Sequence, residues 1–264
     1  MTLGWTGGRG QIMKRNTKSL GSAFPGSITL LGLALPLLMA VPESRSAEDP
    51  RKSAFASWTF DQSGPVEKKN PLLVIGDVEF LELPEEEKKA SLARGGTGWF
   101  ARLQGGHLDA GTHLNLPGSA GTVYLRARDP SGRWEGGLFS KRGSHEITNF
   151  NLFAADGRIG GEFHAEGPLP GSVSFAAAGT MGKGWHDLVV RYDGATLEIF
   201  CDGSSLGIVP WAGGKLTQNT EPLLIGAETV NGTPVRPFPG EIEQAAIWSR
   251  ALKDSEIKAL NRRP

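Results

Sequence analysis

The sequence predicts an all-β protein, a loop-rich sandwich or barrel. Glycine and proline are frequent: 37 Gly and 17 Pro among 264 residues, about a fifth of the chain where about 12 % is usual. Short alternations of apolar and polar residues recur between turn-forming residues, which is typical of antiparallel sandwiches and barrels. Apolar residues recur at the spacing of a helix only in the last dozen residues. These three observations favour stacked sheets followed by a short helix.

Composition excludes several classes of function. The 28 basic and 28 acidic residues cancel, so no electrostatic attraction favours a nucleic-acid partner, which needs clustered Lys and Arg. Cys201 is the only cysteine, which excludes an intrachain disulfide and a structural zinc site built from cysteines. Because Cys201 alternates with Leu197 and Ile199 on one strand face, we expect it to be a small buried hydrophobe.

Residues 1–46 are predicted to be a secretory signal peptide. Basic residues precede an apolar run of 14 residues, shorter than the ~20 that a helix needs to cross a bilayer. Cleavage is expected after Ser46, and Met13 has the features of the true start, with residues 1–12 as an upstream extension. An uncleaved membrane anchor is the alternative. In both cases the bulk of the chain is exported, as a secreted, periplasmic or cell-surface domain over 47–264.

Twelve segments with strand-like alternation follow the leader, each bounded by Gly, Pro, Asp, Asn or charged residues. A run of Glu and Lys at 85–89 separates the second from the third and is predicted to be a solvated charged loop or a short helical turn. The predicted strands are Ala54–Phe60, Val78–Leu83, Trp99–Leu103, Thr122–Arg128, Gly137–Lys141, Phe150–Ala154, Arg158–His164, Ser172–Ala177, Trp185–Tyr192, Thr196–Cys201, Leu223–Gly226 and Gly240–Trp248.

Three Asp-Gly pairs are predicted to form tight hairpin turns, because glycine takes the positive φ that such turns require. They would join the strands of 150–208 into one antiparallel meander. The pairs are Asp156-Gly157, Asp193-Gly194 and Asp202-Gly203.

The C-terminal end carries helix signals. Asp254 is expected to be the N-cap, with Glu256 in the first turn of a short helix that continues through Ile257 and Leu260. No linker long enough to separate two domains interrupts the chain before this helix. Residues 47–264 are therefore predicted to form one domain.

Four segments share an order and spacing with a known family. Residues 238–252 (FPGEIEQAAIWSRAL) match the pattern F-x-G-x-I-D-x-(V/A)-x-I-(Y/W)-x-R-A-L, and 185–203 match W-x-x-(L/V)-x-V-x-Y-D-G … L-x-(I/L)-Y-x-D-G. Residues 56–61 (ASWTFD) and 138–141 (LFSK) fit two further strands of that family. The chain thus resembles the laminin-G-like domains of the concanavalin A-like jelly-roll family over 53–264.

This resemblance implies a concanavalin A-like jelly-roll β-sandwich of two antiparallel sheets with a short C-terminal helix. The apolar positions of the matching motifs are expected to be core, with Trp and Phe supplying much of the buried area. These positions are Trp58, Phe60, Trp185, Ile242, Ile247 and Trp248.

The resemblance also implies a calcium ion at a sheet edge. The matching ligand positions are Asp61 and Glu243, where Glu replaces the usual Asp and Gln62 replaces a following acid. Two carboxylates with backbone carbonyls can supply part of the 6–8 oxygen ligands that calcium takes. Calcium binding by Asp61 and Glu243 is therefore an expectation.

Glucanases of this fold carry an E-x-D-x-x-E strand motif, to which the run at 241–246 is similar. Glu241 and Glu243 share a strand face, but Glu243 replaces the middle Asp and Ala246 replaces the last carboxylate. The catalytic pair of a glycoside hydrolase is therefore incomplete. A hydrolase that uses Glu241 and Glu243 is kept as an alternative, and the prediction is a protein without enzymatic activity.

The family implies a lectin-like, carbohydrate-binding module. Sugars stack on exposed aromatic rings, and their hydroxyl groups form hydrogen bonds with polar side chains. Tryptophans in Gly-rich loops and polar residues near the central strands are therefore the candidate sugar-binding residues. A polysaccharide or glycoconjugate is the expected partner. A structural envelope domain that binds a cell-surface protein and no sugar is the alternative. The candidate residues are Trp134, Trp211, Trp99, His145, Asn149 and His164.

Overall fold

The computed structural model describes residues 49–144, 147–167, 171–177 and 181–261. These belong to the compact unit Ser44–Pro264. The predicted signal peptide and its cleavage position lie outside the described residues. Among the residues that are described, no helix has the length and apolar character needed to span a membrane.

Strands dominate the described chain, with three short helices at its margins. The helices are η1 (Pro50–Ser53), α1 (Glu85–Ala93) and α2 (Asp254–Leu260), and the strands are β1 (Ala56–Trp58), β2 (Phe60–Asp61), β3 (Gly64–Pro65), β4 (Leu73–Ile75), β5 (Val78–Glu82), β6 (Trp99–Leu103), β7 (His107–Asp109), β8 (Gly121–Arg128), β9 (Gly136–Lys141), β10 (Phe150–Ala155), β11 (Arg158–Glu166), β12 (Gly171–Ala177), β13 (His186–Tyr192), β14 (Thr196–Cys201), β15 (Ser204–Pro210), β16 (Lys215–Leu216), β17 (Leu224–Ile225), β18 (Glu228–Val230), β19 (Thr233–Val235) and β20 (Glu241–Trp248).

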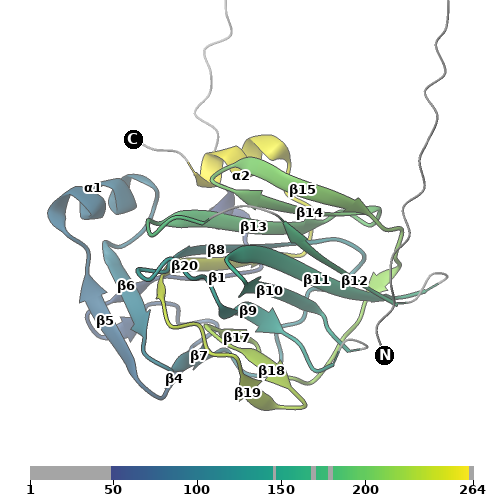
Figure 1. The fold of residues 1–264 in the computed structure, drawn as a ribbon, viewed down its shortest axis with the longest axis horizontal. Helices are drawn as coiled ribbons and strands as arrows, with labels where there is room; N and C mark the ends of the chain where they lie inside the picture. The colour runs from purple at the N-terminus through teal and green to yellow at the C-terminus, as the bar shows by residue number, and fades with distance from the viewer. Residues whose placement is uncertain (1–48, 145–146, 168–170, 178–180, 262–264) are drawn as a thin grey trace, which may run out of the picture. The chain divides into compact units, whose positions relative to one another are not determined.

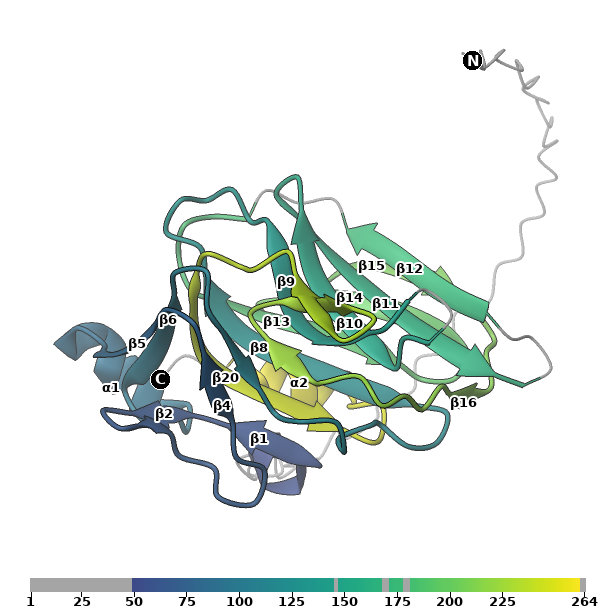
Figure 2. The ribbon, with the colours of Figure 1, turned by 90° about the horizontal axis from the view of Figure 1, so that it is seen from below.

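Two eight-stranded antiparallel sheets form a sandwich, as the sequence predicts. The first sheet has the order β15-β14-β13-β8-β20-β6-β5, with β1 paired to β20, and the second has the order β12-β11-β10-β9-β17-β7-β4, with β16 paired to β11. Figure 1 shows the two sheets as stacked layers, with α1 and α2 beside the first sheet and the β18–β19 hairpin beside the second. Figure 2 views the sandwich from below.

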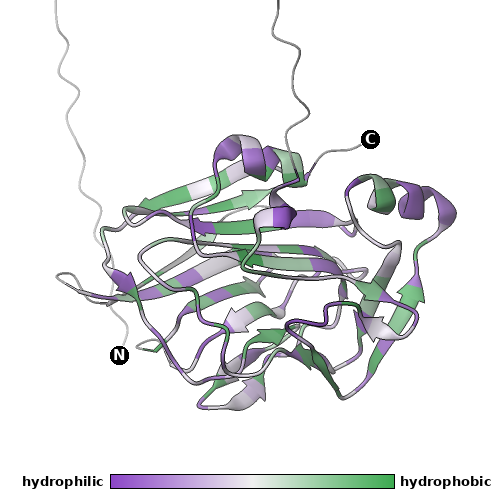
Figure 3. Cartoon of the chain, turned by 180° about the vertical axis from the view of Figure 1, so that it is seen from behind, coloured by the Kyte–Doolittle hydropathy of each residue, from purple (hydrophilic) through white to green (hydrophobic). Residues whose placement is uncertain are grey.

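The core lies between the sheets because apolar side chains alternate along the strands. Figure 3 shows this alternation as bands of hydrophobic and hydrophilic residues. Trp58 and Phe60 are buried here, as expected, and so are Ile242 and Ile247. Trp248 is also buried but belongs to a second cluster, where the outer face of the first sheet packs against Leu252, Ile257 and Leu260.

Two predictions about packing are wrong. Trp185 is not core: it is half-buried, with its ring edge-on to Phe100 at 5.7 Å and the Arg128 guanidinium 4.6 Å from its centre. Cys201 is only partly buried, at the margin of the core, although burial raises the pKa of its thiol to about 12. Trp185 immediately precedes β13 and Cys201 ends β14, and at such positions alternation no longer decides which side chains are covered.

The three predicted Asp-Gly turns are confirmed as hairpin turns, but they do not form one meander. The first joins β10 to β11 in the second sheet, whereas the other two join β13, β14 and β15 in the first sheet. The charged run at 85–89 begins the helix α1, which is longer than the solvated loop or short helical turn that its sequence predicts. Asp254 is not the N-cap of α2, because Lys253 holds that position and Glu256 bonds back to its backbone N–H.

Candidate functional site

Three neighbouring strands of the second sheet place a row of polar side chains on its outer face. Ser140, Asn151 and Glu162 are cross-strand partners on β9, β10 and β11. The residues that alternate with them, such as Phe139 and Leu152, point into the core, so this polar row must face outward. All three members are nearly inaccessible to solvent.

Two oxygens in the polar row have no hydrogen-bond partner. They are Ser140 Oγ and Asn151 Oδ1, which belong to residues opposite each other on adjacent strands. Leaving a buried polar atom unpaired costs about 1–3 kcal/mol. Such atoms mark places where a polar molecule would be favourable.

Alternating charges run from the polar row across the face to one end of the sandwich. Arg142 Nε lies 3.2 Å from Glu162 Oε2, and the other side of its guanidinium is 3.5 Å from Glu228 Oε2. Arg236 follows, 2.9 Å from Glu228 Oε1 and 3.2 Å from Glu135 Oε1. This charge ladder (Glu162, Arg142, Glu228, Arg236 and Glu135) begins at the almost fully buried Glu162 and ends at the solvent-exposed Glu135.

An aromatic ring lies beside the exposed part of the ladder. Phe153 follows Asn151 on the same outward face of β10 and is half-buried. Its ring covers Gly160 so closely that any Cβ there would collide with it. The Arg236 guanidinium is 5.8 Å from the ring centre. Glycine at 160 therefore lets the ring lie against the sheet.

The charge ladder ends in a pocket at the loop end of the sandwich. This end pocket has a volume of about 620 Å³, within the range of small-ligand sites. Arg133 and Asp156 are exposed in its wall, and Asp156 donates its backbone N–H to Glu135 Oε2. Its lining residues are Asp129, Ser131, Arg133, Glu135, Asp156, Pro237 and Pro239.

Asp129 fixes the loop that forms one wall of this pocket. Burial alone would raise the pKa of its carboxyl, but hydrogen bonds from Ser131 and Trp134 lower the pKa below its usual value. Its two oxygens accept the backbone N–H groups of Ser131 at 2.8 Å and Trp134 at 2.6 Å. The ionised carboxylate therefore holds the loop shape while contributing charge to the pocket.

Trp134 is not an exposed platform, so that prediction is wrong. Its side chain is fully buried: Nε1 donates to the Gly182 carbonyl and the ring packs against Phe238. The φ of 47° at Trp134 turns the indole away from solvent. The same loop lines the end pocket through its exposed residues Arg133 and Glu135.

The other two candidate tryptophans lie elsewhere. Trp211 is half-buried after β15, with its ring 5.2 Å from that of Tyr192. Trp99 is half-buried at the start of β6, beside a shallow pocket that Asp61 also lines. The structure thus does not bring Trp99, Trp134 and Trp211 together into one aromatic surface.

The polar candidates have mixed outcomes. Asn149 is fully buried, and its amide bonds three backbone groups, of Leu116 and Thr217, so it is not accessible to a ligand. His164 lies on β11, two residues beyond Glu162, with Nδ1 2.8 Å from Thr217 Oγ1. His145 lies outside the described residues.

The surroundings of Glu243 do not suit the role of calcium ligand that the family resemblance implies. Its carboxylate is buried, with Oε2 2.8 Å from Arg126 Nε and 3.9 Å from Arg94. These guanidiniums supply the positive charge that a cation would bring. Asp61 is part-exposed by contrast, and hydrogen bonds from Ser63 hold its pKa below the usual value. The two carboxylates thus lie in different surroundings.

Glu241 is also held by arginines. Its oxygens lie 3.0 Å from Arg102 and 2.5 Å from Arg128, and the carboxylate is almost fully buried on the outer face of the first sheet. Glu241 and Glu243 are therefore neutralised separately and do not face each other across a cleft. This is unlike the geometry of a glycosidase pair.

Sequence reasoning missed the polar row and the charge ladder. Their signal was present: on three successive strands, outward positions are polar while inward positions are apolar, as at Ser140 with Arg142 and Glu162 with His164. What the sequence could not show is that Arg236, from a distant hairpin, lies across the same face.

Comparison with known proteins gives a family match that agrees with the observed fold. The family model of the concanavalin A-like lectin/glucanases superfamily matches residues 104–258, more than half of the chain. No curated protein sequence matches.

Solved structures share the fold at low sequence identity. The binding domain of Paraclostridial Mosquitocidal Protein 1 has a TM-score of 0.58 and 12 % identity, covering 80 % of this chain and 52 % of that one. Domain 4 of AbnA, a GH43 extracellular arabinanase from Geobacillus stearothermophilus solved with arabinotriose, has a TM-score of 0.56 and 14 % identity, covering 80 % and 98 %. The botulinum neurotoxin serotype G binding domain has a TM-score of 0.56 and 12 % identity, covering 79 % and 50 %. The chain spans about half the length of these two toxin structures.

Proposed function

The chain belongs to the concanavalin A-like lectin/glucanase superfamily, and from this premise we propose that it is an exported, non-catalytic carbohydrate-binding module. The observation that carries the proposal is the end pocket, a cavity of about 620 Å³ lined by charged side chains and prolines, which the charge ladder reaches through Glu135. A carbohydrate-binding relative of the same fold, AbnA domain 4, was solved with arabinotriose.

The chemistry of the pocket suits a saccharide. Arg133 has no ion-pair partner among the described residues and is free to donate to hydroxyl groups. Asp156 and Glu135 supply acceptors, and Pro237 and Pro239 supply apolar surface beside them. Convergent polar groups next to apolar surface are the usual elements of a small-ligand site.

Charge favours a neutral sugar. Three carboxylates, Asp129, Glu135 and Asp156, line the pocket, while Arg133 is the only lining base and Arg236 pairs with Glu135. An anionic sugar would meet net repulsion there. We therefore expect neutral polysaccharides or glycoconjugates to bind and uronic acid or sialic acid polymers to bind poorly.

Binding to a panel of neutral and acidic glycans tests this proposal. Arg133→Ala and Asp156→Asn should each weaken the affinity for the best neutral glycan about tenfold, because each removes a hydrogen bond to the ligand. Lys215→Ala is the matched control, since Lys215 is exposed on β16 away from the pocket. The expected result for this control is unchanged affinity.

Two outcomes would contradict the site or the function. If Trp211→Ala abolishes binding while both pocket variants keep it, the sugar site lies beside Trp211. If the folded protein binds no glycan at all, the carbohydrate proposal fails. A protein partner then becomes the better hypothesis, because β4 is an edge strand whose Leu73, Val74 and Ile75 are exposed.

Export rests on the leader sequence. Expression in a host with a secretory pathway should release protein whose first residue follows Ser46, as N-terminal sequencing would show. Retention of the leader in the membrane fraction would support the uncleaved anchor instead.

A further inference from the structure

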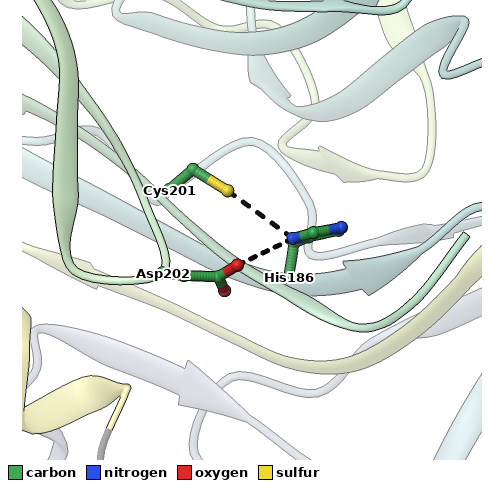
Figure 4. A group of neighbouring side chains, drawn as sticks. All are labelled: His186, Cys201 and Asp202. Atoms are coloured by element: carbon green, nitrogen blue, oxygen red, sulfur yellow. Dashed lines mark hydrogen bonds and ion pairs between the residues drawn. The ribbon is translucent and has the colours of Figure 1, made fainter. Parts of the chain in front are cut away.

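The ends of two adjacent strands bring a histidine, a cysteine and an aspartate together. His186 begins β13, Cys201 ends β14, and Asp202 follows in the hairpin turn. Figure 4 shows both the thiol of Cys201 and the carboxylate of Asp202 directed at the same ring nitrogen of His186. Within the described part of the chain, this is the one group of three metal-capable side chains of these types.

Distances within the group resemble those in a metal site. His186 Nδ1 lies 2.8 Å from Asp202 Oδ2 and 3.6 Å from Cys201 Sγ. A fourth donor is near, because Met181 Sδ lies 3.9 Å from Cys201 Sγ. Ligands held at about 2.0–2.3 Å from a tetrahedral ion lie about 3.3–3.8 Å from one another. Small shifts would therefore suffice to coordinate an ion.

We propose that His186 Nδ1, Cys201 Sγ and Asp202 Oδ2, with Met181 Sδ beside them, bind a single thiophilic d¹⁰ metal ion, Zn²⁺ or Cu⁺. The donor set decides the class of ion. Sulfur and imidazole ligands favour zinc and copper, whereas calcium and magnesium take oxygen ligands. Neither the fold family nor the saccharide pocket requires this site.

The surroundings hold the ligands in place. Asp202 Oδ1 accepts the backbone N–H of Asp187 at 3.0 Å, which leaves Oδ2 directed at His186. The ring of Trp134 lies edge-on to the imidazole at 5.7 Å and restricts its rotation. Groups that orient metal ligands in this way raise metal affinity.

Spectroscopic titration of the purified protein with Co²⁺, a zinc substitute, tests the proposal directly. After EDTA treatment and removal of the chelator, we expect one equivalent of Co²⁺ to bind and to produce a thiolate-to-metal charge-transfer band. The band should disappear in Cys201→Ser, and affinity for Zn²⁺ should fall at least tenfold in Cys201→Ser and in His186→Gln. His113→Gln is the matched control, because His113 is exposed elsewhere.

A second titration separates the two ions. Met181→Leu removes the thioether, a ligand that Cu⁺ uses and Zn²⁺ does not. If Met181→Leu binds Cu⁺ more weakly than the wild-type protein does, while its Zn²⁺ affinity is unchanged, the site is assigned to Cu⁺. If the substitution leaves the affinity for both ions unchanged, the site is assigned to Zn²⁺. Absence of the charge-transfer band in folded wild-type protein, or Zn²⁺ binding that survives both Cys201→Ser and His186→Gln, overturns the proposal. Because no sugar enters these titrations, their failure leaves the carbohydrate proposal unaffected.

Discussion

On the outer face of the first sheet, Arg126 lies between the carboxylates of Asp187 and Glu243, 2.9 and 2.8 Å away. Burial raises the pKa of Tyr124 well above its usual value, so its phenol stays protonated and donates to Asp187 Oδ1 at 2.8 Å. Three buried polar atoms nearby, on Arg94, Glu243 and Gln244, have no partner. A fourth, His186 Nε2, belongs to the proposed metal group.

Gly96 closes this charged network, and its lack of a side chain is required there. A Cβ at Gly96 would lie less than 3.0 Å from Ser91 Oγ, Gln244 Nε2 and Glu243 Oε1. Gly96→Ala should therefore lower the free energy of unfolding by about 1–3 kcal/mol, the usual cost of overpacking. Urea denaturation measures this loss. Gly184→Ala is the control, since its Cβ would meet no atom within 4 Å, and equal effects of the two variants would refute the steric explanation.

Helix α2 is stabilised at its first turn by one glutamate. Glu256 accepts the backbone N–H of Lys253 and pairs with Arg250 at 2.7 Å. The Arg250 guanidinium is the main reason that the pKa of Glu256 falls to about 2. The stabilisation from Glu256 is therefore present above its unfolded pKa of about 4.5 and is lost as the pH falls toward 2.

Glu256→Gln should accordingly lower the free energy of unfolding at pH 7 by about 1 kcal/mol, a value reduced for partial exposure. The difference from wild type should shrink as the pH falls from 4.5 to 2. Urea denaturation at a series of pH values measures it. Glu86→Gln is the control, because Glu86 is exposed in the first turn of α1. A difference that is independent of pH would contradict the ion-pair explanation.

At the scale of the whole molecule, the first sheet lies between two apolar clusters, one packed on each of its faces. The buried pair Glu243–Arg126 lies on the outer face, so it links the stability of the sandwich to a charge network. Removing one partner of a buried ion pair leaves the other charge uncompensated, which costs about 3–5 kcal/mol.

Glu243→Gln should therefore lower the free energy of unfolding by about 3 kcal/mol, equally in EDTA and in calcium. Thermal or urea unfolding in both buffers measures the effect. Glu79→Gln is the matched control, because Glu79 forms an exposed pair with Arg102 at 3.7 Å. A wild-type protein stabilised by calcium, with that response lost in Glu243→Gln, would support the calcium expectation instead.

Local patterns account for most of what could be predicted about the fold. Alternation predicted the long strands, such as β8 and β20, because core-facing apolar residues alternate along them with polar or aromatic residues of the outer face, although both faces are buried. Short strands such as β4 and β18 were missed, since three residues carry no periodic signal. Trp134 was misjudged because loop φ values, not alternation, set the direction of its side chain.

The sequence by itself determined the jelly-roll family and the hairpin turns. Each of these depends on residues close together in the chain, where spacing and turn chemistry are decisive. Only the tertiary structure decided that Arg236 reaches the face of β10 and that Glu243 meets Arg126. It also decided that His186 meets Cys201. These contacts join residues from different strands, and they depend on strand register and sheet stacking, which no local pattern specifies.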